Sequence, residues 1–259
     1  MEAQLLAYCQ LRGLATVRTG DLTGPLRVTG KQERELLSRM ARAGLIAKVK
    51  RGLYLVPPSL PLGGVWSPDF GLAINTLMED RLAMYQVCGP NAFNYYGFDQ
   101  QVPNRVYVYN DRLSGDTKIG ALELTLIKVA TNRLGSTEEV RSASDMRVVY
   151  SSRVRTLVDA VYDWSRFDSL PRGYAWIRDE LAAHRIEAAE LANVAVRYGN
   201  QGTVRRIGAL LEQEGADEGV LRTLEAGLRL SKSVIAAVPG DPRRGPKNPR
   251  WGVILNERR

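Results

Sequence analysis

Side chains that commonly perform catalysis or hold metal ions are scarce in this chain. Its 259 residues include one histidine, His184, and two cysteines, Cys9 and Cys88. A zinc site of the usual kind takes several histidine and cysteine ligands, so we expect no metal centre. We expect both cysteines to be buried thiols of a cytoplasmic protein. His184 is expected at the exposed end of a helix, where the helix dipole favours a cation.

Other active-site patterns are missing as well. The sequence contains neither the Gly-x-Ser-x-Gly turn of serine hydrolases nor a Gly-x-Gly-x-x-Gly dinucleotide motif. Residues 199–203 lack the Gly-Lys-Ser/Thr ending of a phosphate loop, so we expect a turn in which Thr203 caps the next helix. The acidic residues have no metal-ligand spacing, and Asp159 and Asp163 are expected to be solvent-exposed. The sequence therefore predicts neither an enzyme nor a bound cofactor.

Basic side chains are the more informative group. The chain has 36 Lys and Arg against 28 Asp and Glu, a net charge of +8 with a pI near 9.6. Residues 1–58 hold ten basic and four acidic side chains, and residues 241–259 hold six and two. The two ends are therefore +6 and +4, and the 182 residues between them are −2. This distribution favours a polyanionic partner for the N-terminal segment.

The best-marked element of that segment is a helix that begins after Thr29 and ends at Gly44. Thr29 and Gln32 have the spacing of a capping box, and glycine is common just past a helix end. Leu36, Leu37 and Met40 form its apolar stripe. The remaining faces carry side chains that suit a DNA groove. We expect DNA contacts from Thr29, Lys31, Gln32, Arg34, Glu35, Ser38, Arg39 and Arg42.

The elements around this helix predict a winged helix-turn-helix domain over residues 1–58. Helices are expected at 2–11 and 21–26, and two strand-like runs at 45–49 and 53–56 form a hairpin. In such a domain the third helix enters the major groove and the hairpin reaches the backbone. The hairpin turn would place cations on phosphates from Lys48, Lys50 and Arg51. Additional basic contacts are possible from Arg205, Arg206, Arg243, Arg244 and Lys247.

A proline- and glycine-rich linker at 56–64 separates this domain from a larger C-terminal domain, residues 59–259. We expect a mixed α/β part at about 65–165 and a mainly helical part at about 170–259, so the fold class is α+β. Helices are expected at 69–82 and 152–164, and strands at 102–109, 122–129 and 147–150. No apolar run is long enough for a membrane helix, and we expect no signal peptide at the N-terminus. The tyrosines of this domain could stack on bases, but half-buried packing is expected for Tyr85, Tyr95, Tyr96, Tyr107 and Tyr109.

Four stretches resemble the AbiEi family of type IV antitoxins, which also act as transcriptional regulators. The first is the hairpin segment that ends in Arg51-Gly52-Leu53-Tyr54. The third contains Arg155-Thr156-Leu157-Val158-Asp159. The stretches follow one another in the order of the family and span nearly the whole chain: 43–54, 89–98 with 101–103, 152–159, and 205–212 with 249–251 and 255–256.

The resemblance implies two activities. The winged helix would bind inverted repeats in double-stranded DNA at its own promoter and repress transcription. The C-terminal domain would counter a nucleotidyltransferase-like toxin without forming a stable complex. No residue of this chain can be assigned to the second activity from a motif. A stand-alone, ligand-responsive transcription factor is the alternative, and a nucleic-acid-processing enzyme is a third interpretation that no motif supports.

Overall fold

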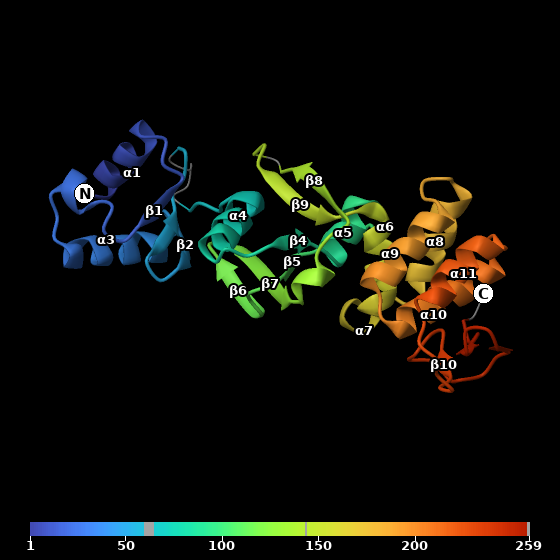
Figure 1. Cartoon of the computed structure of the whole chain (residues 1–259). Coiled ribbons are helices and arrows are strands. Elements are labelled where there is room, and N and C mark those ends of the chain that lie inside the picture. Colours follow the sequence, from blue (N-terminus) through green and yellow to red (C-terminus); the bar gives the residue numbers. More distant parts are fainter. Residues whose placement is uncertain (60–64, 143, 258–259) are drawn as a thin grey trace. The chain divides into compact units, whose positions relative to one another are not determined.

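The computed structural model describes residues 1–59, 65–142 and 144–257 (Figure 1). Helices are combined with several sheets, in agreement with the α+β class. The chain divides into two compact units. Unit 1 comprises residues 1–86, 104–131 and 139–149, and unit 2 comprises 87–103, 132–138 and 150–259. These units do not coincide with the predicted division between 58 and 59, and residues 60–64 of the predicted linker lie outside the described residues.

The N-terminal segment of unit 1 has its own apolar core. Its elements are α1 (Glu2–Leu11), β1 (Thr16–Arg18), α2 (Thr23–Leu26), α3 (Gly30–Arg42), β2 (Ala47–Lys50) and β3 (Leu53–Leu55). Strand β3 lies between β1 and β2 and is antiparallel to both. The short strand β1 is not predicted from the sequence, because only one of its three residues is buried. The buried core is formed by Leu5, Leu6, Cys9, Val17, Leu22, Leu36, Leu37, Met40, Ile46, Tyr54 and Val56.

A six-stranded mixed sheet follows, in the order β6-β7-β5-β4-β9-β8. The parallel pair β5–β7 and the antiparallel pair β6–β7 lie in unit 1, together with helix α4 (Phe70–Asp80). A Cβ at Gly71 would lie 2.7 Å from Val148, so glycine allows α4 to pack closely there. Strands β6 and β8 are not predicted, because most of their residues are exposed. The strands are β4 (Tyr85–Val87), β5 (Val106–Asn110), β6 (Gly115–Ile119), β7 (Leu122–Lys128), β8 (Thr137–Arg141) and β9 (Arg147–Ser151).

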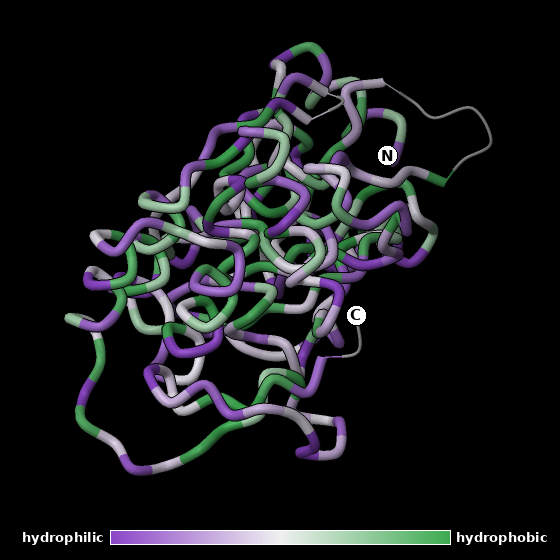
Figure 2. Tube along the Cα trace, turned by 90° about the vertical axis from the view of Figure 1, so that its right-hand side faces the viewer, coloured by the Kyte–Doolittle hydropathy of each residue, from purple (hydrophilic) through white to green (hydrophobic). Residues whose placement is uncertain are grey.

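Unit 2 is mainly helical, and apolar side chains of its helices form a buried core. Figure 2 shows the whole chain coloured by hydropathy, with apolar and polar stretches alternating along the trace. Helix α6 packs against α8, α9 and α10, and α9 also packs against α11. A small sheet, β10-β12-β11, completes the core, with Trp251 lying against Gly208. The elements are α5 (Pro90–Tyr95), α6 (Arg153–Tyr162), α7 (Trp164–Phe167), α8 (Arg172–Ala182), α9 (Ala188–Tyr198), α10 (Gln201–Gln213), α11 (Glu218–Ala226), β10 (Ile235–Ala236), β11 (Lys247–Asn248) and β12 (Val253–Ile254).

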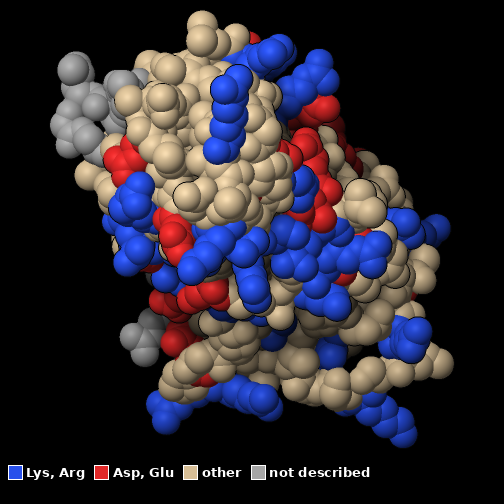
Figure 3. Space-filling model, turned by 90° about the vertical axis from the view of Figure 1, so that its left-hand side faces the viewer, with Lys and Arg blue, Asp and Glu red and all other residues tan. Residues whose placement is uncertain are grey.

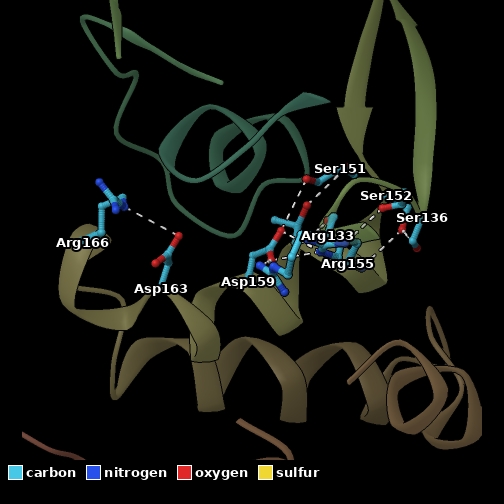
Figure 4. Close-up of polar contacts among 10 residues, drawn as sticks. Arg133, Ser136, Ser151, Ser152, Arg155, Asp159, Asp163 and Arg166 are labelled. Atoms are coloured by element: carbon cyan, nitrogen blue, oxygen red, sulfur yellow. Dashed lines mark hydrogen bonds and ion pairs between the residues drawn. The ribbon is translucent and has the colours of Figure 1, made fainter. Parts of the chain in front are cut away.

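The predicted exposure of Asp159 is wrong, because its side chain is completely buried in unit 2 (Figure 4). Nε of Arg155, also fully buried, donates to both carboxylate oxygens at 3.0 Å, and Nη2 of Arg133 lies 3.3 Å away. Arg155 precedes Asp159 by four residues, so both side chains lie on one face of α6 and can pair inside the core. Asp163 is half-buried and lies 3.7 Å from Arg166.

The structure also locates the other residues considered for chemistry. His184 is exposed just beyond the end of α8, as predicted, and both cysteines are buried. Helix α10 is capped by Asn200, whose side chain accepts a hydrogen bond from the Thr203 amide at 2.9 Å, so the predicted cap by Thr203 itself is wrong. Among the tyrosines, Tyr95 is half exposed, Tyr109 is buried and the other three lie between these extremes.

Within the described residues, no group of three or more potential ligand side chains is arranged to hold a metal ion. None of the described helices combines the length and apolarity needed to cross a membrane.

Candidate nucleic-acid interface

Helix α3 begins with the predicted capping box. Thr29 Oγ1 accepts from the Gln32 amide at 3.3 Å, and Gln32 Oε1 accepts from the Thr29 amide at 2.9 Å. Such a cap stabilises a helix by about 1 kcal/mol. Both residues were also predicted to contact DNA, but their oxygens are engaged in the cap. The Gln32 side-chain nitrogen has no hydrogen-bond partner in the described part of the chain, so it is the group of this pair that can reach a base.

A buried carboxylate fixes the inner face of the same helix. Glu33 has no exposed surface. Its two oxygens accept from the Gly20 and Leu22 amides at 2.7 and 2.8 Å, in the loop that leads into α2. From the sequence alone, Glu33 is recognised only as one of the four acidic residues of the segment. Its spacing offered a signal, because it shares the buried face of the helix with Leu36, Leu37 and Met40.

The outer face of α3 carries the predicted contact residues, and the structure brings them together. Arg39 Nε pairs with Glu2 at 2.8 Å, and Arg42 Nε lies 3.4 Å from the Ser38 carbonyl oxygen. No ion pair is formed by Lys31, Arg34 or Glu35 with any described residue. The exposed side chains of this face are Lys31, Gln32, Arg34, Glu35, Ser38, Arg39 and Arg42.

The β2–β3 hairpin adds three cations in different environments. Lys48 and Arg51 are exposed, whereas Lys50 is half-buried. Lys50 Nζ lies 2.5 Å from Oδ2 of Asp80 on α4, and Arg18 Nη1 lies 2.9 Å from the other carboxylate oxygen. The hydrogen bond from Lys50 holds the pKa of Asp80 below its usual value. Sequence reasoning missed Asp80, because nothing along the chain connects it with the hairpin.

The five additional basic residues separate into two groups. Arg205 is buried in unit 2, where its guanidinium donates to the carbonyl oxygens of Trp251, Ser233 and Gly252 at 2.6 Å. It therefore has no free face for a phosphate, which corrects the expectation of a DNA contact. Arg206 is half-buried and donates to the Ala236 carbonyl at 3.0 Å. The three that remain exposed are Arg243, Arg244 and Lys247.

Figure 3 shows one face of the molecule, with basic side chains in blue and acidic ones in red. Lys and Arg side chains are numerous on this face, but acidic side chains lie among them. The N-terminal segment itself contains acidic side chains beside its cations, such as Glu35 on α3 and the Glu2 partner of Arg39. The surface is therefore a patterned one rather than a uniform positive field, which suits recognition at defined positions.

The chain matches no protein-family model and no curated protein. Among solved structures it is similar to the crystal structure of RV2827C protein from Mycobacterium tuberculosis, with a TM-score of 0.59 and 14% sequence identity. The similarity covers 97% of this chain and 89% of that one. At this level of identity the likeness concerns the fold alone.

Proposed function

We propose that residues 1–58 form a winged helix-turn-helix domain that binds double-stranded DNA. Helix α3 is the recognition helix that enters the major groove, and the β2–β3 hairpin is the wing on the backbone. The observation that carries this proposal is the outer face of α3. It is polar and largely cationic, it is exposed, and the helix behind it is fixed by a capping box and by the buried Glu33. A rigid helix with such a face is what base recognition requires.

The side chains of that face divide by chemistry. Lys31, Arg34 and Arg42 can donate to guanine or to phosphate, whereas Glu35 can accept only from a donor such as the cytosine amino group. Ser38 can do either. Arg51 and Lys48 on the hairpin suit phosphates, which add affinity for any sequence. The interface thus combines sequence-reading groups on the helix with backbone-binding groups on the wing.

We further propose that the chain represses its own promoter at inverted repeats and acts as an antitoxin. This part rests on the resemblance to the AbiEi family. In that scheme residues 59–259 counter a nucleotidyltransferase-like toxin without a stable complex, and the chain is not an enzyme. Co-expression with the adjacent gene tests the antitoxin role: growth arrest by that gene should be relieved by the full chain. A neighbouring gene that is harmless when expressed alone contradicts it.

The DNA-binding role is tested by measuring affinity for the upstream region of its own gene and for a shuffled duplex. Replacing Arg34 by Ala should weaken operator binding by about 1–3 kcal/mol and relax the preference over shuffled DNA. The matched control is Arg12→Ala, which removes the same charge from an exposed position outside the proposed interface. Equal losses in the two variants would show that α3 does not read bases.

A cavity in unit 1 favours the second candidate, a ligand-responsive transcription factor. Its volume is about 580 Å³, in the range of small-molecule sites. The Gln10 side-chain nitrogen is buried without a hydrogen-bond partner in the described residues, so a ligand acceptor could satisfy it. A small molecule that changes operator affinity would support this candidate. The cavity is lined by residues of α1 and the loop that follows it, by residues just after β3, by residues at and before the start of α4, and by two residues before β9. These are Cys9, Gln10, Gly13, Leu14, Ala15, Val56, Pro58, Trp66, Ser67, Pro68, Asp69, Leu72, Ser144 and Met146.

A further inference from the structure

The last residue of α4, Asp80, holds two cations of the N-terminal segment. Its carboxylate forms an ion pair with Lys50 Nζ at 2.5 Å and accepts from Arg18 Nη1 at 2.9 Å, and Arg81 Nε lies 3.7 Å away. Its side chain is only 4% exposed. A carboxylate so far removed from water needs its partners, because a buried and unpaired charge is strongly unfavourable.

The sheet register explains why both cations reach one carboxylate. Arg18 and Lys50 each pair with Leu53 of β3, from its two sides. Residues directly opposite one another in a sheet project to the same face. Arg18 and Lys50 therefore flank the buried Leu53 on one side of the sheet, and Asp80 forms ion pairs with both.

The three side chains differ in how far they can leave this contact. Lys50 is 33% exposed and Arg18 is 57% exposed, and both are long and flexible. The short carboxylate of Asp80 ends a helix and is nearly covered. The two cations can thus turn towards an external oxyanion, whereas Asp80 cannot follow them.

We propose that Asp80 is an internal competitor for the DNA backbone, because it occupies Lys50 of the wing and the neighbouring Arg18 of β1, which phosphates would otherwise bind. This inference rests on the proposed DNA-binding function. Carboxylate and phosphate oxygens accept from the same donor hydrogens, so Lys50 must leave Asp80, at least in part, to neutralise a phosphate. Asp80 therefore lowers the affinity for DNA of every sequence. Because the wing then contributes less binding energy, the contacts of α3 with bases contribute a larger share of the total.

The test compares Asp80→Asn with Glu79→Gln in the full chain. Both changes remove one negative charge from the end of α4, but Glu79 is exposed and forms no ion pair with a described residue. Asp80→Asn should bind operator and shuffled DNA about fivefold more tightly than Glu79→Gln, the order expected for one charged contact. Equal affinities of the two folded variants, or weaker binding by Asp80→Asn, would overturn the proposal.

A second variant approaches the same contact from its other side. Replacing Lys50 by Ala should cost more DNA affinity in the Asp80→Asn chain than in the natural chain, where the ammonium is already engaged. An equal cost in both backgrounds means that the two residues do not compete and refutes the inference. This comparison uses pairs of chains with the same residue at position 80, so a general loss of stability cancels.

Hydrogen exchange without DNA separates this inference from the proposed function. The amides of β2 and β3 should exchange faster in Asp80→Asn than in Glu79→Gln, because the contact that ties the hairpin to α4 is lost. If the natural chain binds no promoter DNA, the proposed function fails and the competitor role fails with it, although exchange still shows whether Asp80 fixes the hairpin. If the natural chain binds DNA and the two variants behave alike, only the inference about Asp80 fails.

Discussion

Helices α3 and α10 carry arginines with opposite environments. On α3, Arg34, Arg39 and Arg42 are exposed on the face opposite the apolar stripe. On α10, Arg205 is buried, and its guanidinium satisfies three carbonyl oxygens near the small sheet of unit 2. Both helices are amphipathic and both are capped at their N-termini. The difference lies in what faces each helix, namely solvent for the one and backbone carbonyl groups for the other.

This comparison shows that positive charge on a helix does not by itself indicate a polyanion-binding surface. An arginine contributes to binding only if its donors are not already used inside the protein. Buried arginines such as Arg155 and Arg205 stabilise the fold, and burial lowers the pKa of Arg205 without giving it access to a ligand. The net charge of the chain therefore overstates the number of cations that can meet DNA.

The largest expected effect comes from breaking the buried pair of α6. Replacing Arg155 by Ala leaves the fully buried Asp159 with the Arg133 guanidinium at 3.3 Å and the Ser151 hydroxyl at 3.5 Å. Removing one partner of a buried ion pair costs about 3–5 kcal/mol, so the free energy of unfolding should fall by that amount. Urea unfolding followed by circular dichroism measures it. A loss below about 1 kcal/mol would mean that the pair behaves like a surface salt bridge.

A smaller effect is expected from Arg205→Ala, which removes the guanidinium donor from three carbonyl oxygens of unit 2. The Gly252 oxygen still accepts from the Ile235 amide at 3.0 Å. Each buried acceptor that loses its partner is unfavourable, and the total cost should be about 2–3 kcal/mol. The matched control is Arg243→Ala, an exposed position where the change in unfolding free energy should stay within about 0.5 kcal/mol. Operator affinity of the folded Arg205→Ala chain should be unchanged. A loss of affinity without a loss of stability would restore Arg205 as a DNA contact.

Local features of helix α3 were predictable from the sequence. The capping box of Thr29 and Gln32 and the stripe of Leu36, Leu37 and Met40 depend on neighbours within one or two helical turns. The sequence carries such information directly, because the helical repeat fixes which residues share a face. The same reasoning correctly placed most of the α3 side chains now found on the exposed face.

Contacts between distant parts of the chain were not predictable. Asp80 reaches Lys50 because the register of β2, β3 and β1 places two cations around Leu53, and no spacing along the chain encodes that. Asp159 is four residues from both Asp163 and Arg155. Its spacing from Asp163 suggests an exposed acidic face of the helix, whereas its actual partner is Arg155 on the preceding turn, inside the core. Arg205 meets carbonyl groups of residues 233, 251 and 252, which only the folded chain brings to α10.

The smallest expected effect concerns two adjacent cations of the hairpin, Lys50 and Arg51. Arg51 is exposed and has no ion pair with a described residue, whereas Lys50 is held by Asp80. Arg51→Ala should therefore reduce affinity for all DNA sequences several-fold. It should also make the negative slope of log affinity against log salt shallower by about 0.9, the value for one phosphate contact. Lys50→Ala should change both quantities less, because breaking the contact with Asp80 offsets what a phosphate contact contributes. Titrations at several salt concentrations measure both variants, and a larger loss for Lys50→Ala would place Lys50 on the backbone without competition from Asp80.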